Sequence, residues 1–154
     1  MKPSVKRSPA EQIFLKRTQT IYSGMKQRAK EMYDSVPFSL NEFREWVTAQ
    51  FSGNIAGIAR CEYSGQKTLT AETFCIDHKM PTSRGGGFWF TNLAICSEME
   101  NLRKGDLAWY EYDELKKTVN EFSPKARDGI WRRLEVGDVQ RFSHYRRKAK
   151  GKTK

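Results

Sequence analysis

The stretch that decides the fold covers residues 61–106 and reads CEYSGQKTLTAETFCIDHKMPTSRGGGFWFTNLAICSEMENLRKGD. Residues 73–78 combine β-branched and aromatic side chains, which predicts a short strand. A glycine-rich loop follows, and residues 92–96 predict a second strand. The sequence Ser97-Glu98-Met99-Glu100 is a capping box that predicts a helix directly afterwards, and Gly105 is expected to end or bend that helix. The expected order is therefore strand, loop, strand, helix.

Helices are expected on both sides of this stretch. Ser8-Pro9-Ala10-Glu11 is a capping box with proline at the first helical position, and Ser39 and Glu42 form a second one between Phe38 and Phe43, which are placed as a hydrophobic staple. The first helix is long and carries apolar residues at helical spacing, namely Ile13, Phe14, Ile21, Met25, Ala29 and Met32. The second runs to about Phe51 and is expected to bury Leu40, Phe43 and Val47. Two further helices are expected after Gly105, and the helical tryptophans Trp46, Trp109 and Trp131 are expected in the core.

Length and composition limit the class of protein. The chain has 154 residues, of which 38% are hydrophobic and 30% charged, so it suits one soluble globular domain with appended arms. No apolar run approaches the 18 residues that a membrane span requires, and the N-terminus lacks the apolar stretch of a signal peptide. We therefore expect a cytoplasmic protein without a membrane partner.

The positive charge lies at the two ends of the chain. The net charge is +10, and the whole excess lies in residues 1–8 and 141–154, which contain no acidic residue. Basic and acidic side chains are equal in number in residues 9–140. Basic arms suit a polyphosphate partner because each Lys or Arg that meets a phosphate releases condensed counterions. A solubilising tail is the alternative.

Residues 61–106 resemble the HNH endonuclease family. The resemblance rests on Asp77-His78 closing a strand, Pro81, the Ser83-Arg84-Gly85-Gly86 loop, Asn92-Leu93 opening the next strand, and Asn101 with Lys104-Gly105 in the following helix. It implies an α+β fold, a mainly helical chain around a small ββα-metal motif. The expected segments are a basic N-terminal arm (1–8), a helical segment (9–52), the nuclease motif (53–106), a second helical segment (107–140) and a basic tail (141–154).

The resemblance also implies a role for each site residue. His78 would be the general base, because a neutral imidazole takes a proton from water near pH 7. Asn92 would hold the loop and orient His78 through side-chain hydrogen bonds. Asp77 and Asn101 would supply hard oxygen ligands to one Mg²⁺ or Mn²⁺. Asn101 replaces the last histidine of the founding pattern, which gives the order H, N, N.

A second departure from the family concerns zinc. Many relatives carry two C-x-x-C pairs, whereas this chain reads Cys61-Glu62-Tyr63-Ser64 and Cys96-Ser97-Glu98-Met99. Structural zinc sites need four Cys or His ligands, so no structural zinc is expected. We expect this corner to be packed with Met99 and two buried thiols.

Several residues outside the catalytic group are expected to contact nucleic acid. Arg84 beside the loop glycines, and Lys104 on the Asn101 face of the helix, are candidates for phosphate contacts, with a solvated lysine as the alternative for Lys104. Arg146, Arg147 and Lys148 are the tail candidates. Phe88-Trp89-Phe90 either packs under the strands or stacks on bases, and packing is the favoured interpretation.

The sequence therefore predicts a metal-dependent DNA endonuclease, with RNA as an alternative substrate. Its small size suggests a phage or mobile-element protein, acting in the host cytoplasm and with partner proteins from the same element. The rival is a nucleic-acid-binding protein that keeps the scaffold without turnover. A secreted bactericidal nuclease domain is a third alternative, although such domains usually accompany translocation domains.

Overall fold

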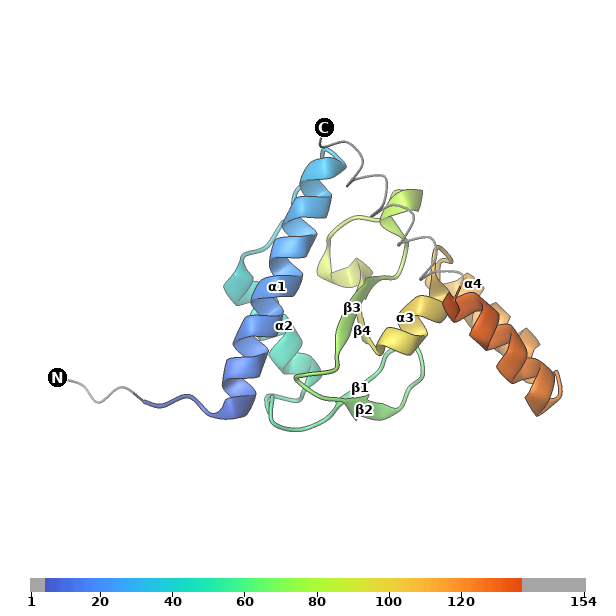
Figure 1. Ribbon diagram of the computed structural model, residues 1–154. Helices are drawn as coiled ribbons and strands as arrows, with labels where there is room; N and C mark the ends of the chain where they lie inside the picture. Colours follow the sequence, from blue (N-terminus) through green and yellow to red (C-terminus); the bar gives the residue numbers. More distant parts are fainter. Residues whose placement is uncertain (1–4, 137–154) are drawn as a thin grey trace, which may run out of the picture. The chain divides into compact units, whose positions relative to one another are not determined.

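The computed structural model describes residues 5–136 and has the expected α+β class, mainly helical with two small antiparallel sheets (Figure 1). The chain forms two compact units, the first ending at Ser97 and the second beginning at Glu98. The predicted segment 53–106 therefore runs across this boundary. Arg146, Arg147, Lys148 and the rest of the basic tail lie outside the described residues. No helix within the described part is long and apolar enough to cross a membrane.

Helix α1, Pro9–Glu31, begins at the predicted capping box. The Ser8 amide donates to Glu11 Oε2 at 2.6 Å, and the Glu11 amide donates to Ser8 Oγ at 3.2 Å. The buried stripe contains Phe14, Thr18, Met25 and Ala29. Ile13 and Met32, which were expected in that stripe, are 41% and 43% exposed. Ile13 is exposed because it lies one position, or about 100°, around the helix from Phe14, and Met32 is exposed because it follows the last helical residue, Glu31.

Helix α2, Leu40–Gln50, begins at the second predicted box, in which the Ser39 amide donates to Glu42 Oε2 at 2.6 Å. The rings of Phe38 and Phe43 stack with centroids 6.1 Å apart, so the predicted staple is present. Phe43 and Val47 are fully buried as expected, while Leu40 is half-buried. Figure 1 shows α1 and α2 side by side, and the two helices pack together.

Two hairpins follow in the first unit. Strand β1, Ala59–Arg60, pairs antiparallel with β2, Lys67–Leu69, and β3, Cys75–His78, pairs antiparallel with β4, Leu93–Cys96. The register of the second pair places Cys75 opposite Cys96 and His78 opposite Leu93. The loop between β3 and β4 contains two short 3-10 turns, η1 (Thr82–Arg84) and η2 (Phe90–Asn92).

Arg17 joins α1 to the start of β3. Its Nε donates to the Phe74 carbonyl at 2.8 Å, Nη2 donates to the same oxygen, and the guanidinium lies 5.3 Å from the centroid of the Phe74 ring. Phe74 is fully buried and meets Phe51 edge-on. These contacts anchor the strand that carries Asp77 and His78.

The second unit is helical. It contains α3 (Glu98–Lys104), α4 (Trp109–Asn120) and a helical stretch at 124–136. Gly105 follows α3 with a φ of 52°, a left-handed conformation that suits glycine and ends the helix as expected. Arg103 Nε donates to Glu135 Oε1 at 2.7 Å, and its guanidinium lies over the Trp131 ring. Trp131 is buried as expected, whereas Trp109, at the first position of α4, is 50% exposed.

Candidate functional site

Asp77 and His78 are the last two residues of β3, as the motif predicts. Their partners across the hairpin are Ala94 and Leu93. Asp77 is half-buried, and His78 is only 8% exposed. The rings of His78 and Phe88 form a T-shaped contact, with centroids 4.8 Å apart and planes at 82°. The imidazole is therefore held in an apolar contact at the end of the strand pair.

Asn92 holds the loop that follows His78. Its Oδ1 accepts from the Met80 amide at 2.9 Å, and its Nδ2 donates to the carbonyls of Met80 and Gly87 at 3.0 and 2.9 Å. The Lys79 amide also donates to the Asn92 carbonyl at 2.7 Å. Asn92 thus fastens both ends of the loop through backbone groups. That it orients His78 stays a prediction, because the bonds reach neighbouring backbone rather than the imidazole.

The loop glycines permit this close arrangement. A Cβ on Gly86 would lie 1.8 Å from the Met80 carbonyl oxygen and 3.0 Å from Asn92 Nδ2, so only glycine fits there. Gly85 has a φ of 86°, which a residue with a side chain rarely adopts. The hydrogen bonds of Asn92 to the loop backbone are therefore a structural reason for the glycine-rich sequence, whether or not a ligand binds there.

Tyr63 is a functional candidate that the sequence pattern did not reveal. Its hydroxyl donates to Asp77 Oδ2 at 2.6 Å, and the tyrosine is 9% exposed. Burial, and then the charge of Asp77, raise the pKa of Tyr63 well above its usual range. The phenol therefore stays protonated and acts as a donor that orients the carboxylate. The only sequence signal was its position between Cys61 and Ser64 in the altered zinc pair.

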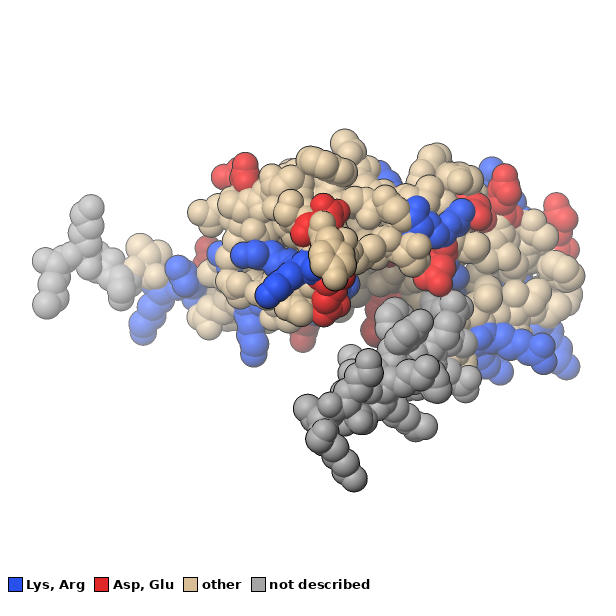
Figure 2. Space-filling model, turned by 90° about the horizontal axis from the view of Figure 1, so that it is seen from above, with Lys and Arg blue, Asp and Glu red and all other residues tan. Residues whose placement is uncertain are grey.

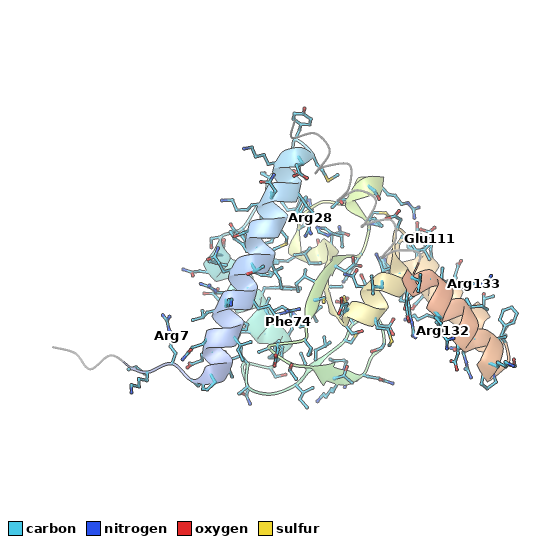
Figure 3. The ribbon with its side chains drawn as sticks, in the orientation of Figure 1. Arg7, Arg28, Phe74, Glu111, Arg132 and Arg133 are labelled. Atoms are coloured by element: carbon cyan, nitrogen blue, oxygen red, sulfur yellow. The ribbon has the colours of Figure 1, made fainter. Side chains whose placement is uncertain are left out.

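Arg28 is the second candidate that the pattern did not reveal. It is an exposed residue of α1, and Figure 3 shows it on the side of the helix that faces β3 and the loop after it. Partial burial lowers the pKa of Arg28, while the carboxylates of Asp77 and Glu31 raise it. Arginine remains charged in any case. Arg28 thus brings a positive charge into electrostatic contact with Asp77 from 49 positions away in the sequence, a distance at which no local pattern reveals it.

Asn101 and Lys104 belong to α3 in the second unit. Asn101 is half-buried, and Lys104 is 1% exposed, so the alternative of a solvated lysine is wrong. Met99, expected in a buried corner, is 47% exposed. The buried positions of α3 are Glu100 and Lys104, one turn apart, and Glu100 accepts a hydrogen bond from the Tyr112 hydroxyl. The buried face of α3 is therefore polar, and Met99 does not belong to it.

The altered zinc corner is built from buried thiols. Cys61 and Cys96 are fully buried, and none of the three cysteines forms a disulfide. The Glu62 amide donates to the Ile95 carbonyl at 2.9 Å, which brings the segment after Cys61 beside β4. Within the part of the chain that the structure describes, no group of three or more His, Cys, Asp and Glu side chains could hold a metal ion.

The donors near Asp77 fit a weakly held hard cation. Mg²⁺ usually keeps several waters and binds proteins through one or two carboxylates, so a cluster of three acidic or histidine ligands is not required. The half-buried Asp77 carboxylate, which accepts a hydrogen bond from Tyr63, has the chemistry of such a donor.

The described surface carries both charges. Figure 2 shows basic and acidic side chains interspersed on the face in view, in keeping with the balanced charge of residues 9–140. Arg84 is exposed in η1, within a run from Lys79 to Ser97 that contains no acidic residue. The other basic residue of this run, Lys79, forms an ion pair with Glu62 at 2.6 Å, so the positive charge of the loop comes from Arg84.

Comparison of the sequence with protein-family models and with curated proteins finds no match.

Proposed function

We propose that the protein is a metal-dependent endonuclease that hydrolyses phosphodiester bonds of DNA. The observation that carries the proposal is the Asp77-His78 pair at the end of β3, beside a glycine loop closed by Asn92. These are the residues on which the resemblance to HNH endonucleases rests, and they occur in the strand order that the resemblance implies. A scaffold that only binds has no chemical need for the trio Asp77, His78 and Asn92.

His78 is the general base in this proposal. An imidazole nitrogen accepts a proton from a water molecule as the water oxygen bonds to phosphorus, and the bond from phosphorus to the leaving oxygen breaks. The contact with Phe88 limits the ring's rotation, which keeps the accepting nitrogen in place. Asn92 acts through the loop, since its hydrogen bonds set the backbone that follows His78.

Asp77 and Asn101 are the proposed ligands of one Mg²⁺ or Mn²⁺. When bound, such an ion polarises the phosphate and stabilises charge on the leaving oxygen. Tyr63 keeps the Asp77 carboxylate oriented, and Arg28 supplies a fixed positive charge near it. The charge of Arg28 would favour an approaching phosphate group.

The basic residues supply affinity for DNA that does not depend on the DNA sequence. Arg84, Lys104 and the tail residues Arg146, Arg147 and Lys148 are the proposed contacts to phosphates. Lys104 requires a change in its surroundings to reach a phosphate, because it is buried. A cytoplasmic location is part of the proposal, because cysteines without disulfides are typical of a reducing compartment. An origin in a phage or mobile element is also part of the proposal.

One observation favours a second candidate function, a nucleic-acid-binding protein without turnover. His78 is 8% exposed, and its Nε2 is buried, which limits the access of water to the proposed base. In that case the positively charged arms and loop bind nucleic acid while the histidine is part of the core.

A supercoiled-plasmid assay separates the two functions. The purified protein is incubated with Mg²⁺, Mn²⁺ or EDTA, and the wild type is compared with His78→Ala and with His144→Ala, which replaces the only other histidine. Metal-dependent conversion to open-circle or linear DNA by the wild type and His144→Ala, abolished in His78→Ala, is the expected result. If none of the three proteins converts the plasmid while all three still bind DNA, the result would favour the binding protein. A labelled RNA strand in parallel tests the alternative substrate.

A further inference from the structure

The three consecutive aromatic residues of the loop have different environments. Phe88 is 1% exposed and meets His78, whereas Trp89 is 61% exposed. Phe90 stacks on Phe38 and on Trp46, with centroids 4.0 and 5.5 Å apart and planes within 15°. The packing interpretation therefore holds for the two phenylalanines, and Trp89 is left at the surface.

Trp89 lies against the loop backbone even though it is exposed. A Cβ on Gly87 would lie 2.7 Å from the indole Nε1 and 2.8 Å from Cδ1, so the ring rests over the backbone of Gly87. The Gly87 carbonyl accepts from Asn92 Nδ2, and the phenylalanines on either side are packed. The indole is thus presented by a fastened loop, which lowers the entropy cost when a ligand binds.

The surroundings of Trp89 suit an anionic ligand with flat groups. The segment from Lys79 to Ser97 carries no acidic residue and two basic ones, of which Lys79 forms an ion pair with Glu62 and Arg84 is exposed. The tryptophan adjoins Phe88, which contacts His78, so it lies one residue away from the wall of the proposed site. A nucleic acid combines phosphates for the basic groups with bases that stack on an indole.

We propose that Trp89 is a base-stacking site, which receives an unstacked nucleobase of the DNA strand bound at the His78 site. The choice of DNA rests on the proposed function. Since an aromatic side chain stacks on a base only where the base has left its own stack, the site favours single-stranded, gapped or bulged DNA over an intact duplex.

The test compares binding of two labelled DNA probes in EDTA, where a metal-dependent nuclease does not cut. The probes are a single strand and a blunt duplex of the same sequence, and affinity is measured by fluorescence anisotropy. The variants are Trp89→Ala and Trp89→Phe, with Trp109→Ala as the matched control because Trp109 is 50% exposed in the second unit. Near-UV circular dichroism checks that each variant is folded.

The expected result is an affinity for the single strand about tenfold weaker in Trp89→Ala, a smaller loss in Trp89→Phe, and little change for the duplex. Tryptophan fluorescence of the wild type should be quenched by the single strand, and this quenching should be absent in Trp89→Phe. A merely structural role would not move that signal.

Three outcomes overturn the proposal. If Trp89→Ala and Trp109→Ala bind the single strand equally, Trp89 does not touch DNA, and plasmid cleavage by the wild type would show that the proposed function stands without it. An equal loss on both probes would remove the preference for unstacked bases. If the wild type neither binds nor cleaves DNA, both proposals fail, and self-association that disappears in Trp89→Ala would assign the residue to a protein interface.

Discussion

At the scale of single residues, the site depends on interactions that join distant parts of the sequence. Asp77 lies 14 positions from Tyr63 and 49 from Arg28, and neither partner belongs to the pattern that identified Asp77. The motif residues could be predicted because their chemistry and order are local. Their partners could not, because only the folded chain brings them close.

Tyr63→Phe tests whether the tyrosine positions the carboxylate. Removing the hydroxyl takes away the 2.6 Å bond to Asp77 while leaving the buried ring. Groups that orient a metal ligand typically contribute 10- to 100-fold in affinity or activity, so we expect Mn²⁺ binding, measured by calorimetry, and plasmid nicking to weaken by about tenfold. Tyr33→Phe, at a fully exposed tyrosine, is the control. Unchanged Mn²⁺ affinity and nicking in Tyr63→Phe would show that Asp77 does not need this bond.

The same tyrosine predicts a loss of stability in alkaline solution. Burial, followed by Asp77, raises the pKa of Tyr63, so the native state keeps a proton that the unfolded state releases above about pH 10. The stabilisation is complete below about pH 10 and declines as the pH rises beyond it. Urea unfolding at about pH 8 and about pH 10.5 should show a smaller decrease in the free energy of unfolding for Tyr63→Phe than for the wild type. Parallel decreases would argue against this assignment.

Arg28→Gln tests the charge beside Asp77. Because the charge of Arg28 acts on Asp77, its removal should reduce nicking by about tenfold through a weaker hold on the phosphate. Lys30→Gln makes the same change of charge two positions away on α1 and should have a smaller effect. Initial rates at several DNA concentrations measure both. Equal effects would mean that Arg28 contributes only general charge.

At the scale of helices and strands, prediction succeeded where the signals were contiguous. The capping boxes at Ser8 and Ser39 placed the starts of α1 and α2, because each box satisfies its own backbone amides. The hairpin of β1 and β2 was missed, since strands of two and three residues are too short to show alternation. The expected burial of Met99 was wrong, because the buried positions of α3 are the polar residues Glu100 and Lys104.

The attachment of α1 to β3 is testable through Arg17. Arg17→Met keeps much of the apolar stem but removes the hydrogen bonds to the Phe74 carbonyl. We expect the free energy of unfolding to fall by about 2 kcal/mol, as for a partly buried carbonyl that loses a charged donor. Lys16→Met, at an exposed neighbouring position, should change it little. Urea denaturation followed by circular dichroism measures both, and similar stabilities would mean that water replaces the donor.

At the scale of the whole molecule, the charge and the chemistry occupy different parts of the sequence. The proposed base and its loop belong to a body whose charges balance, and the excess of ten lies at the two ends. DNA affinity and the rate of cleavage should therefore depend on different residues. The ends would raise the local concentration of DNA without touching the reacting phosphate.

Neutralising the tail tests this separation. Changing the seven basic residues in 141–154 to Gln keeps the chain length and removes most of the charge excess. The slope of log affinity against log salt for duplex DNA should become shallower by about 0.9 for each phosphate that the tail no longer neutralises. Nicking at saturating DNA should stay near the wild-type rate, because His78 and Asp77 are untouched. Anisotropy over a series of salt concentrations gives the slope. An unchanged slope would make the tail a solubilising segment, while a reduced rate at saturation would place part of the tail in the catalytic site.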